Sequence, residues 1–320
     1  MNFEQKFNNF IPELTTALSI PNSSDWSVKG FIDYYQNIYS ISTDTKVISK
    51  IIELMIFPKL LEFANNNGFE LKLSPHQNYY PDITFIDNLG KKYAVDLKST
   101  YRTSDSEVNG MTLGAFTGYF RNRLSSKNVL YPYSDYEKHF VFGIIYSRTD
   151  ITKIENYLKS KSITINQAKK KSIITYINEN SDENWNNLQE KVIDTMLDSN
   201  DREVINKYLI NETNIYTIDS FQEIQSVVGD FEFFIQEKWK IAIDRPGSGN
   251  TKNIGSESKI QRLKEGTGLF FREFNENGKA IFDSYWMNYL TKDMAKNEGR
   301  DKPPYSNIAT YKEWVETLKT

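Results

Sequence analysis

The sequence contains no cysteine and only two histidines in 320 residues. Without cysteine there can be no disulfides, thiolate nucleophiles or thiolate zinc sites, and two histidines argue against a histidine-based zinc site. Any metal site must therefore use oxygen ligands, which hard cations such as Mg²⁺ prefer.

Long apolar runs are also missing. The first residues, MNFEQKFNNFIPELTTAL, are polar and acidic with no basic leader, and no later stretch has the apolar length of a membrane span. We therefore expect a cytoplasmic protein that does not enter a membrane. The formal net charge of −3 gives no global sign of nucleic-acid binding, which usually accompanies a basic domain.

The first 147 residues have the pattern of an α/β fold. Residues 44–68, DTKVISKIIELMIFPKLLEFANNNG, open with a residue that can cap a helix, carry apolar residues at helical spacing and end at an Asn-rich glycine. This pattern predicts a helix, bent at Pro58. GFELKLS, residues 80–100 and HFVFGIIYS are short and rich in β-branched or aromatic residues, which predicts strands.

Residues 150–212 differ from the rest, because they are polar and mostly helical in period. Between residues 178 and 203, eight acidic residues face only Lys191 and Arg202. This segment is either a solvated helical insertion or a partner-binding arm, and it should not face phosphates. From residue 213 onward, strand-like NIYTI and KWKIAID lead into RPGSGNTKNIGS, and helical FDSYWMNYL and YKEWVETL follow.

The segment YPDITFIDNLGKKYAVDLKST, residues 80–100, places charged residues inside an apolar hairpin. Its two strands join through NLGK, a plausible turn, and pairing centred near residue 89 puts Asp82 opposite or diagonal to Asp96. Lys98 shares a face with Asp96, because side chains two apart on a strand point the same way. An unpaired buried acid costs several kcal/mol, so this cluster needs compensation.

A divalent cation is one answer, since Mg²⁺ binds one or two carboxylates together with substrate phosphate oxygens. A lysine beside it can hold the attacking water or help to deprotonate it. The alternative is a structural salt bridge between Lys98 and one aspartate. Glu53, on the preceding predicted helix, is either an exposed flank residue or a third metal carboxylate.

Proline-Asp followed by a spacer and Asp/Glu-X-Lys is the signature of the PD-(D/E)XK nucleases, which this hairpin resembles. Further segments resemble, in the same order, a type II restriction endonuclease that reads GATATC; they are DTKVISKIIEL, SPHQNYYPDITF, TLGAFTGYFRN, NVLYPYSDYEKHFVFGIIYSR, EKWKIAID and GSGNTKNIGS. The resemblance covers roughly residues 30–148 and 213–320 and leaves residues 150–212 as an insertion.

The resemblance implies a restriction-endonuclease-like core, a mixed β-sheet flanked by helices, with an inserted helical segment. Residues 1–149 would form the dimerisation and catalytic core, 150–212 the insertion, and 213–320 the DNA-recognition part that completes the core. Asp82 and Asp96 would be metal ligands, Lys98 the catalytic lysine, and Glu53 the helix-borne acid. The implied reaction is Mg²⁺-dependent hydrolysis of double-stranded DNA, leaving 5′-phosphates and blunt ends, with Mn²⁺ as a substitute metal.

The loop 247–251 has residues suited to reading bases, since glycines permit close approach, Asn can pair with adenine and the Thr methyl can contact thymine. Alone, such a loop is usually a flexible turn. By resemblance, base recognition falls on Gly247, Ser248, Gly249, Asn250 and Thr251. Contacts to the DNA backbone or minor groove fall on Thr45, Lys46, Gln77, Asn78, Ser99, Thr100, Thr112, Thr117, Asn122, Arg123, Lys252 and Asn253.

Three departures from the relative lie near these positions: Gly118 replaces a hydroxyl residue, Arg123 an amide and Lys252 a threonine. The two cations could supply phosphate contacts, which give affinity rather than sequence information. Residues 91–128 hold seven Lys or Arg against three acidic residues, so a basic segment exists within an acidic chain.

We expect a homodimer, because a palindromic target demands a matching two-fold axis. Residues 30–43, GFIDYYQNIYSIST, resemble the dimerisation region of the family. A cognate DNA methyltransferase is the other expected partner. Two alternatives remain at this point: a structure-specific repair or recombination nuclease of the same superfamily, and a non-catalytic DNA-binding protein.

Overall fold

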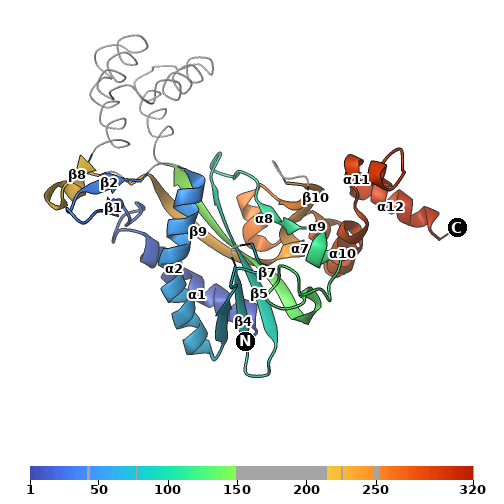
Figure 1. Cartoon of the computed structure of the whole chain (residues 1–320), viewed down its shortest axis with the longest axis horizontal. Helices are drawn as coiled ribbons and strands as arrows, with labels where there is room; N and C mark the ends of the chain where they lie inside the picture. The colour runs from blue at the N-terminus through green and yellow to red at the C-terminus, as the bar shows by residue number, and fades with distance from the viewer. Residues whose placement is uncertain (42–43, 77, 149–214, 225, 248–251, 320) are drawn as a thin grey trace, which may run out of the picture. The chain divides into compact units, whose positions relative to one another are not determined.

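The computed structural model describes residues 1–41, 44–76, 78–148, 215–224, 226–247 and 252–319 (Figure 1). The predicted insertion, Gln77 and residues 248–251 of the predicted recognition loop lie outside this part. The chain divides into two compact units: residues 1–17, 52–146 and 231–320 form the first, and residues 18–51 and 147–230 the second.

A mixed five-stranded sheet is the centre of the first unit. Its strand order is β3-β4-β5-β7-β9. Strands β3, β4 and β5 pair antiparallel, whereas β5 and β7 run parallel. The bounds are Glu70–Leu73 for β3, Ile83–Ile86 for β4, Lys92–Tyr101 for β5, Tyr136–Arg148 for β7 and Val228–Glu237 for β9.

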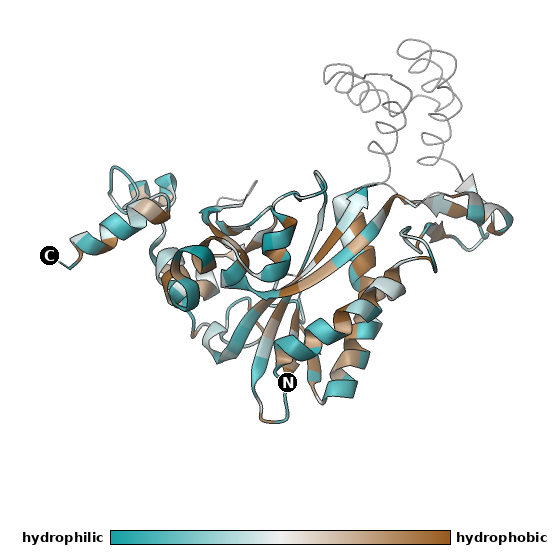
Figure 2. Cartoon of the chain, turned by 180° about the vertical axis from the view of Figure 1, so that it is seen from behind, coloured by the Kyte–Doolittle hydropathy of each residue, from teal (hydrophilic) through white to brown (hydrophobic). Residues whose placement is uncertain are grey.

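Two helices cover one face of this sheet. Helix α1 spans Phe3–Leu18 and α2 spans Thr45–Asn67. Rings of α1 contact the even-numbered residues of β7: the centroids of Phe3 and Phe140 are 5.3 Å apart, and those of Phe7 and Phe142 are 5.1 Å apart. Phe63 of α2 completes the cluster at 5.0 Å from Phe7. Figure 2 shows the long central strands as hydrophobic along much of their length.

The other face packs on the C-terminal segment. Val141 and Ile145, two odd-numbered residues of β7, belong to a core with Phe270, Phe282 and Trp286. Because β7 is buried on both faces, it reads as a continuous apolar run. The helices of this segment are α7 (Lys238–Ile241), α8 (Ile260–Glu265), α9 (Leu269–Phe274), α10 (Gly278–Asn288), α11 (Lys292–Asn297) and α12 (Ile308–Thr317), and the last two extend away from the sheet (Figure 1).

A second sheet lies in the same unit, with strand order β10-β11-β6 and antiparallel pairing throughout. Strand β6 spans Thr112–Ala115, β10 spans Ala242–Pro246 and β11 spans Asn253–Ser256. The KWKIAID strand prediction is wrong in its first half, because Lys238–Ile241 forms the helical turn α7 and the strand begins at Ala242. Trp239 and Ile241 are both buried in this helical turn, so apolar residues at alternate positions do not distinguish a strand from a turn here.

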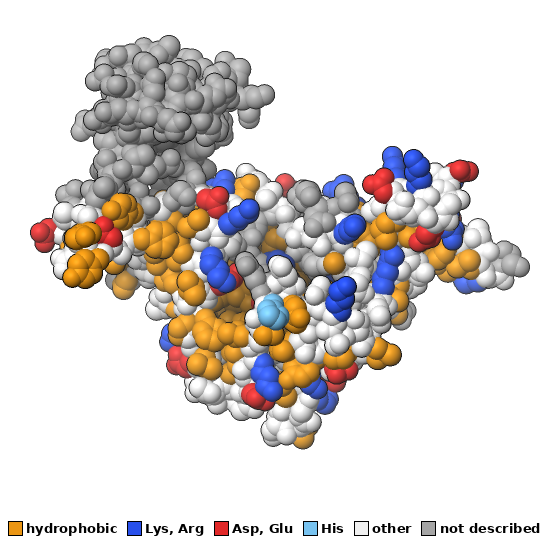
Figure 3. Space-filling model, in the orientation of Figure 1, with side chains coloured by type: hydrophobic (Ala, Val, Ile, Leu, Met, Phe, Trp, Pro, Cys, Tyr) orange, Lys and Arg blue, Asp and Glu red, His pale blue; other side chains and the backbone are white. Residues whose placement is uncertain are grey.

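The second unit contains a small antiparallel sheet of order β1-β2-β8. The strands are β1 (Gly30–Ile32), β2 (Ile38–Ser40) and β8 (Ile215–Tyr216). Apolar side chains are exposed on β1, β2 and the turn between them, where orange side chains gather in Figure 3. The predicted start of α2 is confirmed, because the Asp44 carboxylate accepts the N–H of Lys46 at 2.8 Å and of Val47 at 3.1 Å.

None of the helices in the described ranges is both long enough and apolar enough to span a bilayer.

Candidate active site

The hairpin formed by β4 and β5 sets the geometry of the site. Ile83 pairs with Val95, Thr84 with Ala94 and Ile86 with Lys92, so the residue numbers in each pair add to the same total. One step further along the register, Asp82 stands opposite Asp96, as the sequence predicts. The N–H of Leu97 donates a 2.7 Å hydrogen bond to Asp82 Oδ2, which ties the first carboxylate to the second strand.

Asp96 and Lys98 lie on the same face of β5, and their side chains meet. The Nζ of Lys98 is 2.6 Å from Asp96 Oδ2, and it also donates to the backbone oxygen of Leu97 at 3.1 Å. Asp96 is only 6% exposed, and its Oδ2 accepts no well-directed hydrogen bond from the described residues despite this ion pair. A buried carboxylate oxygen thus retains capacity for another ligand.

Burial and mutual repulsion separate the proton affinities of the two aspartates. Burial first, and then the charge of Asp96, raise the pKa of Asp82 from 3.8 to about 7, against the opposing effect of Lys98. Burial also acts to raise the pKa of Asp96, but Lys98 and Lys238 hold it below its ordinary value. The pair therefore ionises fully only near or above neutral pH, unless another cation compensates it.

These residues fit a divalent cation. Two carboxylates stand opposite each other at one end of the hairpin, one oxygen lacks a well-directed hydrogen bond, and the donor set is all oxygen. Mg²⁺ is commonly bound by one or two carboxylates together with water and phosphate oxygens. Asp82 and Asp96 could therefore hold such an ion.

Lys98 is a cation at neutral pH. Burial would lower its pKa, but Asp96, Asp82 and, to a smaller extent, Glu53 raise it above the ordinary value. A lysine beside a metal could either hold the attacking water or deprotonate it. Because Lys98 is protonated in the metal-free protein, it favours the first role, positioning and charge stabilisation.

Glu53 is half-buried on α2, and its charge acts on Lys98. Across the described ranges, no three side chains of the His, Cys, Asp and Glu types gather closely enough to hold a metal ion. The metal role of Glu53 therefore stays a prediction.

A cleft of about 890 Å³ contains the charged cluster. Its walls come mainly from residues 78–82, β5, β6 and residues 117–128. The structure brings eight of the predicted site residues together here: Asn78, Asp82, Asp96, Lys98, Thr112, Thr117, Asn122 and Asn253.

Other predicted DNA-contacting residues lie elsewhere. Thr100 is buried and its hydroxyl donates to Asn109 O at 2.5 Å, so it has a structural partner. Ser99 is half-buried on β5 and does not line the cleft. Thr45 and Lys46 belong to the second unit. Their contacts with DNA remain predictions.

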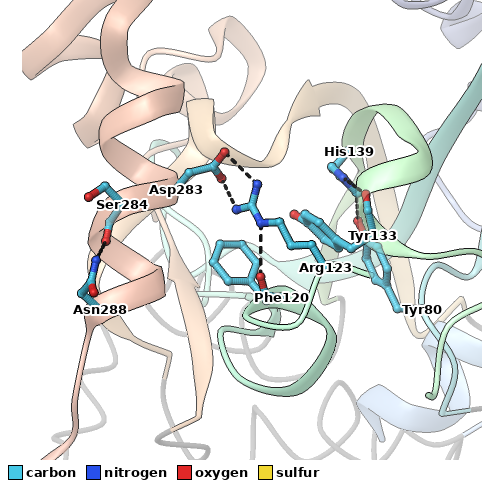
Figure 4. Close-up of polar contacts among 8 residues, drawn as sticks. All are labelled: Tyr80, Phe120, Arg123, Tyr133, His139, Asp283, Ser284 and Asn288. Atoms are coloured by element: carbon cyan, nitrogen blue, oxygen red, sulfur yellow. Dashed lines mark hydrogen bonds and ion pairs between the residues drawn. The ribbon is translucent and has the colours of Figure 1, made fainter. Parts of the chain in front are cut away.

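Arg123 makes an internal contact that the sequence did not predict. Its guanidinium pairs with both carboxylate oxygens of Asp283, with distances of 2.9 Å and 3.2 Å, and its Nε donates to Phe120 O (Figure 4). It also lies over the Tyr133 ring at 5.3 Å. A phosphate contact by Arg123 would have to compete with this ion pair.

The ends of the predicted recognition loop are fixed beside the cleft. Gly247 donates its N–H to Asn253 O at 3.0 Å, and Phe116 donates its N–H to Lys252 O at 3.1 Å. A Cβ on Gly247 would come within 2.7 Å of Thr112 Cγ2, so this close approach requires glycine. Thr112 lines the cleft, and the loop therefore starts and ends next to it.

Sequence reasoning missed an aromatic stack beside the cleft. The rings of Tyr80 and Tyr119 stack at 4.9 Å, and those of Tyr133 and His139 at 3.6 Å. Burial and nearby cations hold the pKa of His139 well below its ordinary value, so its neutral ring donates from Nε2 to Tyr133 O and accepts the Tyr80 hydroxyl at Nδ1 (Figure 4). The sequence signal for this stack is that Tyr80 immediately precedes Pro81-Asp82.

Two aspartates and a lysine project from one hairpin of a mixed β-sheet, and all three side chains line the same cleft. This combination is typical of nucleases of the restriction-endonuclease-like class. A family model described as restriction endonuclease EcoRV matches residues 22–182 and 204–316. The type II restriction enzyme EcoRV of Escherichia coli is 30% identical over 311 residues, covering 95% of this chain and 96% of that protein.

The chain therefore belongs to the EcoRV family of restriction endonucleases, and it is a type II site-specific deoxyribonuclease. The predicted family, fold class and enzyme class are confirmed. Enzymes of this family bind double-stranded DNA and generally depend on a divalent metal. The two matched stretches leave residues 183–203 between them, inside the predicted insertion.

The pKa of Asp82 predicts an unusual pH dependence of stability. The folded protein holds a proton with a pKa of about 7 on a group whose ordinary value is 3.8. Since the folded state binds more protons than the unfolded state between these values, its free energy of unfolding should fall as pH rises from about 4 to about 7. Asp82→Asn should remove this component.

Urea unfolding of the metal-free protein in EDTA measures this effect at each pH. The exposed Asp301→Asn serves as the control, and it should follow the wild type. If the difference in unfolding free energy between wild type and Asp82→Asn stays constant from pH 4 to pH 7, the assigned environment of Asp82 is wrong.

Proposed function

We propose that this protein hydrolyses phosphodiester bonds of double-stranded DNA in a Mg²⁺-dependent reaction, at GATATC, leaving blunt ends with 5′-phosphates. The observation that carries the proposal is the opposed Asp82–Asp96 pair in a cleft of about 890 Å³, with the Nζ of Lys98 2.6 Å from Asp96 Oδ2. Mn²⁺ should replace Mg²⁺, since both accept oxygen ligands in octahedral geometry.

In this proposal Asp82 and Asp96 hold the metal, and Glu53 contributes a third carboxylate. The bound ion would supply charge neutralisation at the phosphate and acidify a bound water. The Leu97 N–H keeps the Asp82 carboxylate in position. Lys98, as an ammonium held against Asp96, would orient the attacking water and stabilise the negative charge that develops on the phosphoryl oxygens.

The lining of the cleft supports a DNA substrate. Lys98 and Lys127 provide cations, and Asn78, Asn122 and Asn128 provide amides. Cations contribute affinity by neutralising phosphates, and amides can bond both phosphates and base edges. The loop Gly247–Thr251 follows a fixed end next to Thr112, and its Gly-Ser-Gly-Asn-Thr sequence supports GATATC as the target.

We also propose a homodimer that joins through the second unit. Five apolar side chains near its small sheet are exposed: Phe31 at 51%, Ile32 at 59%, Tyr34 at 93%, Tyr35 at 79% and Tyr39 at 42%. Monomers rarely expose large apolar patches, whereas interfaces are rich in aromatic residues. Two-fold symmetry would match a palindromic target. A host methyltransferase would protect cellular DNA, and the enzyme would act in the cytoplasm, where foreign DNA enters.

Digestion of a sequenced plasmid that contains one GATATC site tests the proposed function directly. With Mg²⁺ or Mn²⁺ we expect a single linear product, and with EDTA we expect none. Mapping the ends should place both cuts at the centre of GATATC, with 5′-phosphates. Cutting only at junctions or single-stranded structures would show a structure-specific nuclease instead, and specific binding without cutting would show a non-catalytic protein.

Two variants test the proposed catalytic site in the same digestion assay. Asp96→Asn removes a metal ligand, and Lys98→Met removes the ammonium while keeping the chain length. Each should lower the single-turnover rate by roughly 10³-fold, the scale of losing a principal electrostatic group, measured on variant protein that circular dichroism shows to be folded. Wild-type rates in either variant would exclude this cluster as the cutting centre.

The proposed dimer is tested by measuring the mass of the protein in solution. Light scattering after gel filtration should give twice the chain mass for the wild type. Ile32→Lys combined with Tyr35→Lys should raise the dimer dissociation constant at least about tenfold, because it places charges in an apolar interface. Leu89→Lys, at a site that is 78% exposed in the β4–β5 turn, should leave the dimer intact. A monomeric wild type, or an unchanged double variant, would refute this interface.

A further inference from the structure

Lys238, the first residue of α7, is a buried lysine that neither the sequence analysis nor the reaction above has used. It is 2% exposed, and its Nζ has no hydrogen-bond partner among the described residues. Burying an ammonium without a hydrogen-bonded partner is costly, on the order of several kcal/mol. Packing alone does not explain a lysine at this position, because a methionine would fill a similar volume without the cost of burying a charge.

The surroundings of Lys238 place it behind the wall of the catalytic cleft. Its Nζ lies 4.3 Å from the ring centroid of Tyr80 and 5.7 Å from that of Tyr133. A Cβ added to Gly114 would be 3.7 Å from the same Nζ. Tyr80 and Gly114 line the cleft, and Tyr80 is two residues from Asp82. The ammonium is thus close to the site but shielded from solvent.

The charge of Lys238 acts on the two aspartates. Burial lowers its pKa to about 8 despite the opposing effect of Asp96, so the ammonium form still predominates at pH 7. In the other direction, Lys238 is the second cation, after Lys98, that lowers the pKa of Asp96. Burial leaves little water between these groups to screen their charges.

The net charge of the site determines how readily it accepts a divalent cation. When Asp82, Asp96 and Glu53 are ionised, Lys98 and Lys238 balance two of the three negative charges, and the metal-free site carries one net negative charge. A divalent cation would leave one excess positive charge in a largely buried place. A DNA phosphate brings a negative charge to the same place and removes this excess.

We propose that Lys238 is a positioning residue that makes metal binding depend on DNA: its buried ammonium opposes occupation of the Asp82–Asp96 pair by a divalent cation until a DNA phosphate lies in the cleft. The inference rests on the proposed function, because it needs these aspartates to be the metal ligands. It adds a device by which the enzyme would hold its metal firmly only on its substrate.

Lys238→Met tests the proposal, because it removes the charge and keeps a linear apolar chain. Titration of the free protein with Mn²⁺, with unbound Mn²⁺ measured by electron paramagnetic resonance, reports binding without catalysis. In the absence of DNA, Lys238→Met should bind Mn²⁺ about tenfold more tightly than the wild type, since a nearby repulsive charge is gone. Lys238→Arg keeps the charge and should resemble the wild type.

Lys240→Met is the matched control, because it removes a half-buried cation two residues further along α7. It should change the Mn²⁺ affinity by less than about twofold. A blunt duplex whose end carries the 5′-phosphate of the cut product should tighten Mn²⁺ binding to the wild type more than to Lys238→Met. Removing an unpaired buried charge should not weaken folding; should Lys238→Met fail to fold, Lys238→Gln is the second neutral variant.

The outcomes separate the two claims. If Asp96→Asn leaves Mn²⁺ binding intact, the proposed metal site itself is wrong. If Asp96→Asn abolishes binding but the folded neutral variant of Lys238 binds Mn²⁺ no more tightly than the wild type, the metal site stands and the role of Lys238 is overturned.

Discussion

The repulsion between two carboxylates at the end of one β-hairpin is the constraint on which this site depends. The register of β4 and β5 puts Asp82 opposite Asp96, and burial removes the water that would screen them. The Leu97 N–H and the Lys98 ammonium offset part of this cost, and they leave one oxygen of Asp96 without a well-directed hydrogen bond. In the proposed function, a hard cation together with a DNA phosphate would complete the compensation, so an arrangement that is costly for the free protein would suit metal binding on DNA.

The rest of the first unit packs around this hairpin. Strand β5, which carries Asp96, pairs along its length with β7, and β7 is buried on both faces. The stack of Tyr80, Tyr119, Tyr133 and His139 fixes the chain just before Asp82. Strand β6 joins the cleft to β11 and to both ends of the predicted recognition loop. The proposed catalytic and recognition segments therefore share one framework, which suits a sequence-specific nuclease.

Local patterns predicted the parts of the site that depend on local geometry. The pairing of Asp82 with Asp96 followed from a symmetric turn between two strands, and the start of α2 followed from the capping aspartate at residue 44. Lys238 and Arg123 could not be predicted in this way. Their surroundings come from segments far apart in the chain: Tyr80 lies over Lys238, and Asp283 pairs with Arg123. The helical turn at Lys238–Ile241 was missed for the same reason, since tertiary packing decides between conformations that bury the same residues.

Anomalous X-ray scattering from Mn²⁺ tests the central claim most directly, in crystals of the protein with the blunt product duplex. The account predicts a peak about 2.2 Å from carboxylate oxygens of both Asp82 and Asp96, with a phosphate oxygen in the same coordination sphere. A crystal with DNA in the cleft and no anomalous peak at these two residues, or with Mn²⁺ bound elsewhere, would contradict it.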